Sequence, residues 1–160
     1  MNKKLLSVEY SEFVSLNELA AADVELIEKA ISIAQKAYSP YSKFPVGAAV
    51  LLDNGAIYAG SNQENISYPA GTCAERTVLN YVHSNYPDHK IIAIAITALK
   101  SNSAVPITAC GFCRQVLVEM EQNQEKNIRV IFHKPGGSTY IFDAASLLLP
   151  LAFNDTYLKK

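Results

Sequence analysis

The chain has 160 residues, of which 49% are hydrophobic, and its 14 basic and 15 acidic side chains leave a formal net charge of −1. This length suits a single domain with a packed core. The near-neutral charge argues against a nucleic-acid binder, because such proteins carry a basic surface that neutralises phosphates. The N-terminus has only two apolar residues after its lysines before polar residues return, too few for a signal peptide. No apolar run approaches transmembrane length, so we expect a cytoplasmic protein without a membrane partner.

The first part of the chain predicts a helix and then a β-hairpin. Residues 1–20 are an N-terminal extension of uncertain structure, in which 5–10 could form a short extra strand. Apolar residues at helical spacing predict a helix that has Asp23 as its N-cap and stops at Ser39-Pro40. Two apolar runs, 46–52 and 57–60, then flank Asp53-Asn54-Gly55. Asn-Gly in this position predicts a type I′ hairpin, because that turn needs positive φ at both central residues.

Helices and strands alternate in the rest of the chain. Residues 91–97 are apolar on both faces, which indicates a central strand covered by helices on each side. The other expected elements are helices at 73–83, 110–122 and 144–149 and strands at 128–132 and 139–142. This order predicts one α/β domain over residues 21–160, a three-layer α-β-α sandwich around a mixed five-stranded sheet.

All three cysteines fall at the starts of predicted helices, Cys73 in one and Cys110 and Cys113 in the next. A helix N-terminus has unpaired N–H groups and a partial positive charge, both of which favour a thiolate. Both helices follow strands, so their first turns are expected at the carboxyl edge of the sheet. Three thiolates could meet there around zinc, which favours sulfur and keeps one of its four positions open where it is catalytic.

The residues that follow the first cysteine favour a catalytic zinc. Glu75 lies two residues beyond Cys73, and a carboxylate beside an open zinc position can take a proton from water and deliver it elsewhere. Three thiolates leave a divalent cation with a net charge of −1. Arg76 and the two helix dipoles would offset part of that charge.

Other interpretations of the cysteines exist. Cys110-Gly111-Phe112-Cys113 is also the pattern of a thioredoxin-like redox dithiol, although C-x-x-C alone is a weak signal. That interpretation gives no role to the third cysteine or to Glu75. A structural zinc site with three cysteines and a histidine is a second possibility, and its fourth ligand would be His83, His89 or His133.

Five motifs, taken in order, resemble the small three-cysteine cytidine deaminases of the cytidine and deoxycytidylate deaminase family. They are YSPYSKFPVGAA from Tyr38, NQEN at 62–65, CAER at 73–76, CGFCRQ at 110–115 and LLPLAF ending at Phe153. The resemblance implies zinc-dependent hydrolysis of cytidine and 2′-deoxycytidine to uridine and 2′-deoxyuridine with release of ammonia, a reaction of pyrimidine salvage. It also implies one zinc ion per chain and a homotetramer whose active sites are completed by neighbouring subunits.

The resemblance assigns roles to individual residues. Cys73, Cys110 and Cys113 would hold the zinc ion, and Glu75 would carry protons from water to N3 of the base and to the departing amino group. Arg76 would compensate charge, and Tyr68 would lie at a subunit boundary. Asn62 and Glu64 would hold the ribose hydroxyls, the Thr108 carbonyl would lie near the substrate's amino group, and Phe153 would reach in from a neighbouring subunit. The implied substrate-binding positions are Phe44, Asn62, Glu64, Ala74, Thr108 and Phe153.

One position departs from the family pattern. Ala109 stands immediately before the C-x-x-C, where the family usually has proline, and the nearest proline is Pro106. A proline would fix its own φ and favour an extended Thr108, so we expect a less rigid loop with unchanged metal ligands.

Two other functions fit part of the pattern. A deaminase of another cytosine compound, such as blasticidin S, would share the cysteine motifs, but the NQEN segment favours a simple nucleoside. A non-catalytic zinc module that binds a partner protein is the other alternative.

Overall fold

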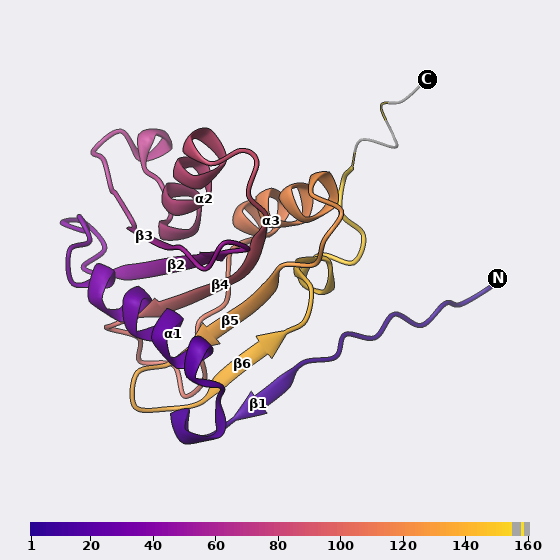
Figure 1. The fold of residues 1–160 in the computed structure, drawn as a ribbon, viewed down its shortest axis with the longest axis horizontal. Helices are drawn as coiled ribbons and strands as arrows, with labels where there is room; N and C mark the ends of the chain where they lie inside the picture. Colours follow the sequence, from indigo (N-terminus) through magenta and orange to yellow (C-terminus); the bar gives the residue numbers. More distant parts are fainter. Residues whose placement is uncertain (155–157, 159–160) are drawn as a thin grey trace.

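The structure, a computed structural model, describes residues 1–154 and 158. Figure 1 shows one sheet with α1 (Ala21–Ala34) on one face and α2 (Ala74–Asn85) and α3 (Gly111–Asn123) on the other. The predicted three-layer α-β-α arrangement is therefore confirmed. No helix in the described part of the chain is long and apolar enough to cross a membrane.

The sheet is mixed, as predicted, but the described residues form six strands rather than five. Their order is β1-β6-β5-β4-β2-β3, and β4 and β5 are the parallel pair among antiparallel neighbours. The strands are β1 (Ser11–Phe13), β2 (Val46–Leu52), β3 (Ile57–Ser61), β4 (Ile91–Ala98), β5 (Arg129–His133) and β6 (Thr139–Phe142).

The sixth strand is β1, which lies at the edge of the sheet. Its three residues pair antiparallel with 139–141 of β6, a strand of only four residues. Residues 5–10, the segment considered for an extra strand, run past the end of β6 and have no strand assignment. Tyr10 instead packs its ring against Tyr140 and Phe142, with ring centroids 4.9 and 5.2 Å away.

In β4 and the middle of β2, the two faces of the sheet carry side chains of different size. Ala49, Ala93 and Ala95 lie in the core under α1, whereas Val50, Ile94 and Ile96 lie in the core under α2 and α3. Alternate residues of a strand point to opposite faces, which explains the separation. The helix α1 also packs directly on Gly47, where an added Cβ would lie only 2.1 Å from the Ala30 carbonyl oxygen.

Two local predictions were wrong in detail. The helix α1 begins at Ala21 with Ala20 as N-cap, and Asp23 lies inside its first turn, where its carboxylate forms two 3.0 Å hydrogen bonds with Arg129. The hairpin between β2 and β3 is present, but its turn is not type I′, because Gly55 has positive φ and Asn54 does not. A three-residue loop that ends in a left-handed glycine satisfies the same sequence signal.

Two short 3-10 helices lie near the candidate site. The first, η2 (Tyr68–Ala70), lies in the loop that leads into α2, and the second, η3 (Ala145–Leu148), replaces the helix predicted at 144–149. A further 3-10 helix, η1 (Leu16–Glu18), links β1 to α1 and carries a capping box between Ser15 and Glu18.

Candidate metal centre and active site

The three cysteines come together at one edge of the sheet. Cys73 is the N-cap of α2, Cys110 is the N-cap of α3, and Cys113 lies in the first turn of α3. The strands β3 and β4 both pair antiparallel with β2, so they point the same way and the helices after them start at the same edge. The three sulfur atoms lie within 4.8 Å of one another.

This donor set fits one zinc ion. Tetrahedral zinc with Zn–S bonds of about 2.3 Å separates its sulfur ligands by about 3.8 Å, within the span of this group. No histidine belongs to the group among the described residues. His89 lies against Asp53 and His133 against Thr139, each through its Nδ1 at 2.9 Å. Three protein ligands among the described residues would leave one position of a tetrahedral zinc ion to water or substrate.

The cysteines differ in their affinity for protons. The Cys113 thiol donates to the Cys73 sulfur, and this bond, with the positive charge of Arg76, lowers the pKa of Cys73 to about 5. The same hydrogen bond and burial raise the pKa of Cys113. The helix N-termini add further positive potential at this point. The lowered pKa favours the thiolate form of Cys73, whereas Cys113 must release its proton to bind zinc.

Glu75 lies in the first turn of α2 and is only 5% exposed. Burial, reinforced by the negative charge of Cys73, raises the pKa of Glu75 above its ordinary value. A carboxyl group in this setting takes up a proton more readily than a surface carboxylate does. That property suits a group that must both accept and deliver protons.

Arg76 connects the two metal-site helices. It lies on α2, and its guanidinium stacks over the ring of Phe112 on α3 at 4.6 Å from the ring centroid. Its Nη2 donates to the Gly71 carbonyl oxygen at 3.3 Å. Its Nε is buried and has no protein hydrogen-bond partner among the described residues. A cation in this place offsets the negative charge of the thiolates.

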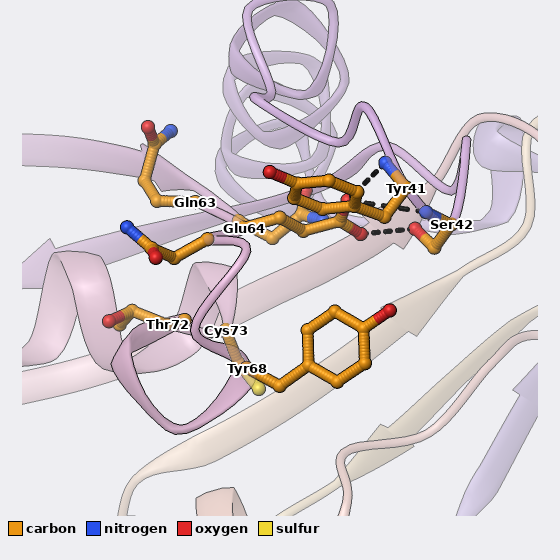
Figure 2. A pocket seen from close by; sticks show the side chains of 10 residues that line it. Tyr41, Ser42, Gln63, Glu64, Tyr68, Thr72 and Cys73 are labelled. Atoms are coloured by element: carbon orange, nitrogen blue, oxygen red, sulfur yellow. Dashed lines mark hydrogen bonds between the residues drawn. The ribbon is translucent and has the colours of Figure 1, made fainter.

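A pocket of about 520 Å³ opens beside Cys73 (Figure 2). It contains three of the predicted site residues besides Cys73, namely Asn62, Glu64 and Tyr68. Tyr41 and Ser42 line it as well, and sequence reasoning gave neither of them a role. The pocket thus brings the NQEN segment and the first metal ligand to one space.

Within the chain, the side chains of Asn62 and Glu64 hold the segment before β2. Asn62 accepts a hydrogen bond from the Val46 N–H at 2.8 Å and donates to the Phe44 carbonyl at 3.1 Å. Glu64 accepts from the N–H groups of Tyr41, at 2.9 Å, and Ser42, at 3.2 Å, and from the Ser42 hydroxyl. The Ser42 hydroxyl is the main reason that the pKa of Glu64 is lowered.

The other predicted substrate-side residues lie outside that pocket. Ala74 is fully buried in the core. Thr108 accepts a hydrogen bond from Arg114, and Phe153 is 60% exposed, with its carbonyl bonded to Gln115. Phe44 contributes its carbonyl to Asn62. Sequence reasoning recognised Arg114 and Gln115 only as part of a motif, because Arg114 also bonds Leu148 and Gln115 bonds Phe153, both in a distant segment.

Comparison with known proteins agrees with this geometry. Residues 20–127 match the family described as the cytidine and deoxycytidylate deaminase zinc-binding region. A cytidine deaminase of Halalkalibacterium halodurans is 43% identical over 95 residues, which are 59% of this chain and 69% of that protein. A probable cytidine deaminase of Dictyostelium discoideum is 38% identical over 141 residues, 85% of this chain and 90% of that protein.

Solved structures give the same result. The crystal structure of cytidine deaminase from Burkholderia pseudomallei superposes with a TM-score of 0.71 and 36% sequence identity, covering 81% of this chain and 98% of that one. Cytidine deaminase from Mycobacterium tuberculosis superposes with a TM-score of 0.63 and 32% identity. The chain therefore belongs to the family of zinc-dependent cytidine and deoxycytidylate deaminases.

Proposed function

We propose that this protein is a cytidine deaminase that converts cytidine and 2′-deoxycytidine into uridine and 2′-deoxyuridine and releases ammonia. The observation that carries the proposal is the meeting of Cys73, Cys110 and Cys113 at two helix N-termini, with the buried carboxyl group of Glu75 in the first turn of α2. Family membership supports a cytosine nucleoside as the substrate.

Cys73, Cys110 and Cys113 would hold one zinc ion. Zinc held by three protein ligands offers its fourth position to water and lowers the pKa of that water. The three thiolates would hold the ion at the N-termini of α2 and α3. Arg76 limits the negative charge that the thiolates build up there, as its position over Phe112 allows.

Glu75 would carry both protons of the reaction. It takes one proton from the attacking water as the water oxygen bonds to C4 of the base, and it delivers that proton to N3. The second proton of the former water then passes through Glu75 to the amino group, the C4–N bond breaks, and ammonia leaves. The C4 carbonyl of uridine remains. The raised pKa of Glu75 supports this double role.

The remaining site residues would bind the nucleoside. We assign Asn62 and Glu64 to the ribose hydroxyls, since both line the pocket beside Cys73. The lowered pKa of Glu64 keeps it an ionised acceptor. The base would lie among the other predicted positions, which are Phe44, Ala74 and Thr108.

We propose further that the enzyme is a cytoplasmic homotetramer whose deaminase domain spans residues 21–160. Phe153 and Tyr68, the residues assigned to subunit boundaries, are 60% and 76% exposed in the single chain, which suits aromatic side chains that a neighbouring subunit covers. The cytoplasm suits the three cysteines, because the zinc ligands must stay reduced.

Replacement of Glu75 by glutamine tests the assignment of the proton carrier. Glutamine keeps the size of the side chain but cannot accept the proton, so we expect zinc content to stay at one ion per chain. Turnover of cytidine should fall by at least the roughly 10²–10⁴-fold typical of a lost general acid–base. A Glu75→Gln variant that keeps the parent's turnover would remove Glu75 from the mechanism.

A further inference from the structure

The guanidinium of Arg114 joins two segments that are far apart in the sequence. Arg114 directly follows the metal ligand Cys113 in the first turn of α3. Its Nε donates to the Ala109 carbonyl oxygen at 2.8 Å and its Nη2 to the Thr108 hydroxyl oxygen at 3.0 Å. Its Nη1 donates to the carbonyl oxygen of Leu148, at the end of η3, at 3.0 Å.

Only an arginine can make this set of contacts. The planar guanidinium carries five N–H donors in a fixed fork, whereas a lysine ammonium is a single flexible point of donation. The loop before α3 lacks the restraint of a proline ring, because Ala109 stands where the family usually has proline. The hydrogen bonds of Arg114 restrain the loop in its place.

Packing restrains only part of this loop, because Ala109 is buried in the core whereas Thr108 beside it is exposed. Thr108, Arg114 and Leu148 line a hollow of about 380 Å³, which residues of the N-terminal segment such as Tyr10 also line. A loop beside open space can relax into it once its polar contacts are lost. The three hydrogen bonds of Arg114 therefore restrain Thr108 on the side that core packing leaves exposed.

The same helix also holds the chain on both sides of Leu148. The Glu121 carboxylate accepts from the N–H groups of Ala145, at 2.6 Å, and Ser146, at 3.0 Å. Gln115 donates to the Phe153 carbonyl oxygen at 2.7 Å. Residues 145–153 thus run along α3, and Arg114 is the point where this C-terminal segment meets the loop that enters the metal site.

We propose that Arg114 is a positioning residue that locks the Thr108–Ala109 loop to the C-terminal segment and so sets where the Thr108 carbonyl meets the substrate. This inference rests on the proposed deaminase function, in which Thr108 lies near the substrate's amino group. Arg114 itself touches neither the substrate nor the reacting atoms. Arg114 acts on the reaction only by positioning Thr108. The hydrogen-bonding geometry of the guanidinium, rather than its charge, produces this effect.

Substitution by lysine separates the fork from the charge. We expect Arg114→Lys and Arg114→Met to keep one zinc ion per chain and to lose a similar share of turnover per bound zinc, about 10²-fold, the size of effect that a misplacement of about 1 Å produces. The matched control is Arg129→Lys. It breaks the two hydrogen bonds between Arg129 and Asp23, which lie at the start of β5, at the end of the strand away from the metal site. That variant should lose stability but keep the parent's turnover per zinc.

Hydrogen–deuterium exchange provides a readout that does not depend on turnover. In Arg114→Lys, peptides covering 105–112 and 145–153 should both exchange faster than in the parent, whereas Arg129→Lys should leave both unchanged. Faster exchange in both segments together is the signature of one restraint that joins them.

The inference is overturned if Arg114→Lys keeps the parent's turnover per zinc, or if the loss of activity only follows loss of zinc. If the Arg114 variants do not fold, the turnover of Thr108→Val and Thr108→Ser tests the inference instead. Serine keeps the hydroxyl that Arg114 binds and should retain activity, whereas valine should lower turnover, and equal turnover of the two also overturns the inference. A parent protein without cytidine turnover would refute the proposed function itself, a result separate from these.

Discussion

The carboxylate of Glu121 offers a quantitative test of how α3 holds the C-terminal segment. Glu121 is 6% exposed, and its Oε2 accepts from the N–H groups of Ile128, at 2.8 Å, and Ala145, at 2.6 Å. Its Oε1 accepts from the Ser146 N–H at 3.0 Å. Three backbone donors from two segments therefore share one buried carboxylate.

Glutamine at this position provides only one oxygen for three donors. If that oxygen takes the place of Oε2, the new NH₂ group faces the Ser146 N–H, and at least one hydrogen bond is lost. A hydrogen bond to a charged group contributes about 1.5–3 kcal/mol, so Glu121→Gln should lower the free energy of unfolding by at least that amount. For a chain of this length, such a loss corresponds to a fall in Tm of about 3–12 °C.

Thermal unfolding of the zinc-loaded protein, at one fixed concentration of protein and metal, measures the effect. Glu119→Gln is the matched control, since Glu119 is exposed on the same helix and its loss should change stability by less than about 0.5 kcal/mol. If Glu121→Gln is as stable as the Glu119 control, the carboxylate does not hold η3 and the account of α3 is wrong.

Four further predictions follow from the site and its surroundings. The zinc-loaded protein should contain one zinc ion per chain and no rapidly reacting thiol, whereas fast labelling of two thiols would favour the redox dithiol. Glu64→Ala should keep its zinc and lose more kcat/KM for cytidine than Ser42→Ala does. The Ser42→Ala variant removes the hydrogen bond from the Ser42 hydroxyl but keeps the Glu64 carboxylate. Equal losses in the two variants would show that Glu64 does not bind the ribose. Burial lowers the pKa of His133 below 6.5 in the folded chain. The stability that neutral His133 contributes is therefore complete above pH 6.5 and is lost as the pH falls through its folded-state pKa. The free energy of unfolding, measured against pH, should fall less on acidification in His133→Gln than in the parent. Ala109→Pro should stabilise the chain by about 0.4–1 kcal/mol and keep its turnover. The reason is that none of the backbone hydrogen bonds described outside helices and strands uses the Ala109 N–H. A clear loss of stability would show that the backbone at this position is one that proline cannot adopt.

The parts of the fold that depend on local signals could be predicted from the sequence. The alternation of elements gave the three layers, and the placement of Cys73, Cys110 and Cys113 at helix starts was enough to bring them to one edge of the sheet. Strands β2 and β4 are long and almost continuously apolar, so they could be recognised from the sequence as apolar runs.

The errors arose where distant segments compete with local signals. Asp23 has the side chain of an N-cap, but the pairing of its carboxylate with Arg129, 106 residues away, places it inside the helix. The strand β1 has no strong pattern of its own and forms because β6, near the other end of the chain, offers an open edge. The contacts of Arg114 with Leu148, of Glu121 with residues 145–146 and of Asn62 with residues 44–46 were hidden for the same reason, because only the folded chain brings those segments together.

Turnover of cytidine by the purified, zinc-loaded protein tests the central claim most directly. The ultraviolet spectrum should change from that of cytidine to that of uridine, with one ammonia released per nucleoside. A chelator should abolish the reaction, and added zinc should restore it. A protein that holds one zinc ion per chain on Cys73, Cys110 and Cys113, yet leaves cytidine and 2′-deoxycytidine unchanged, would contradict the account.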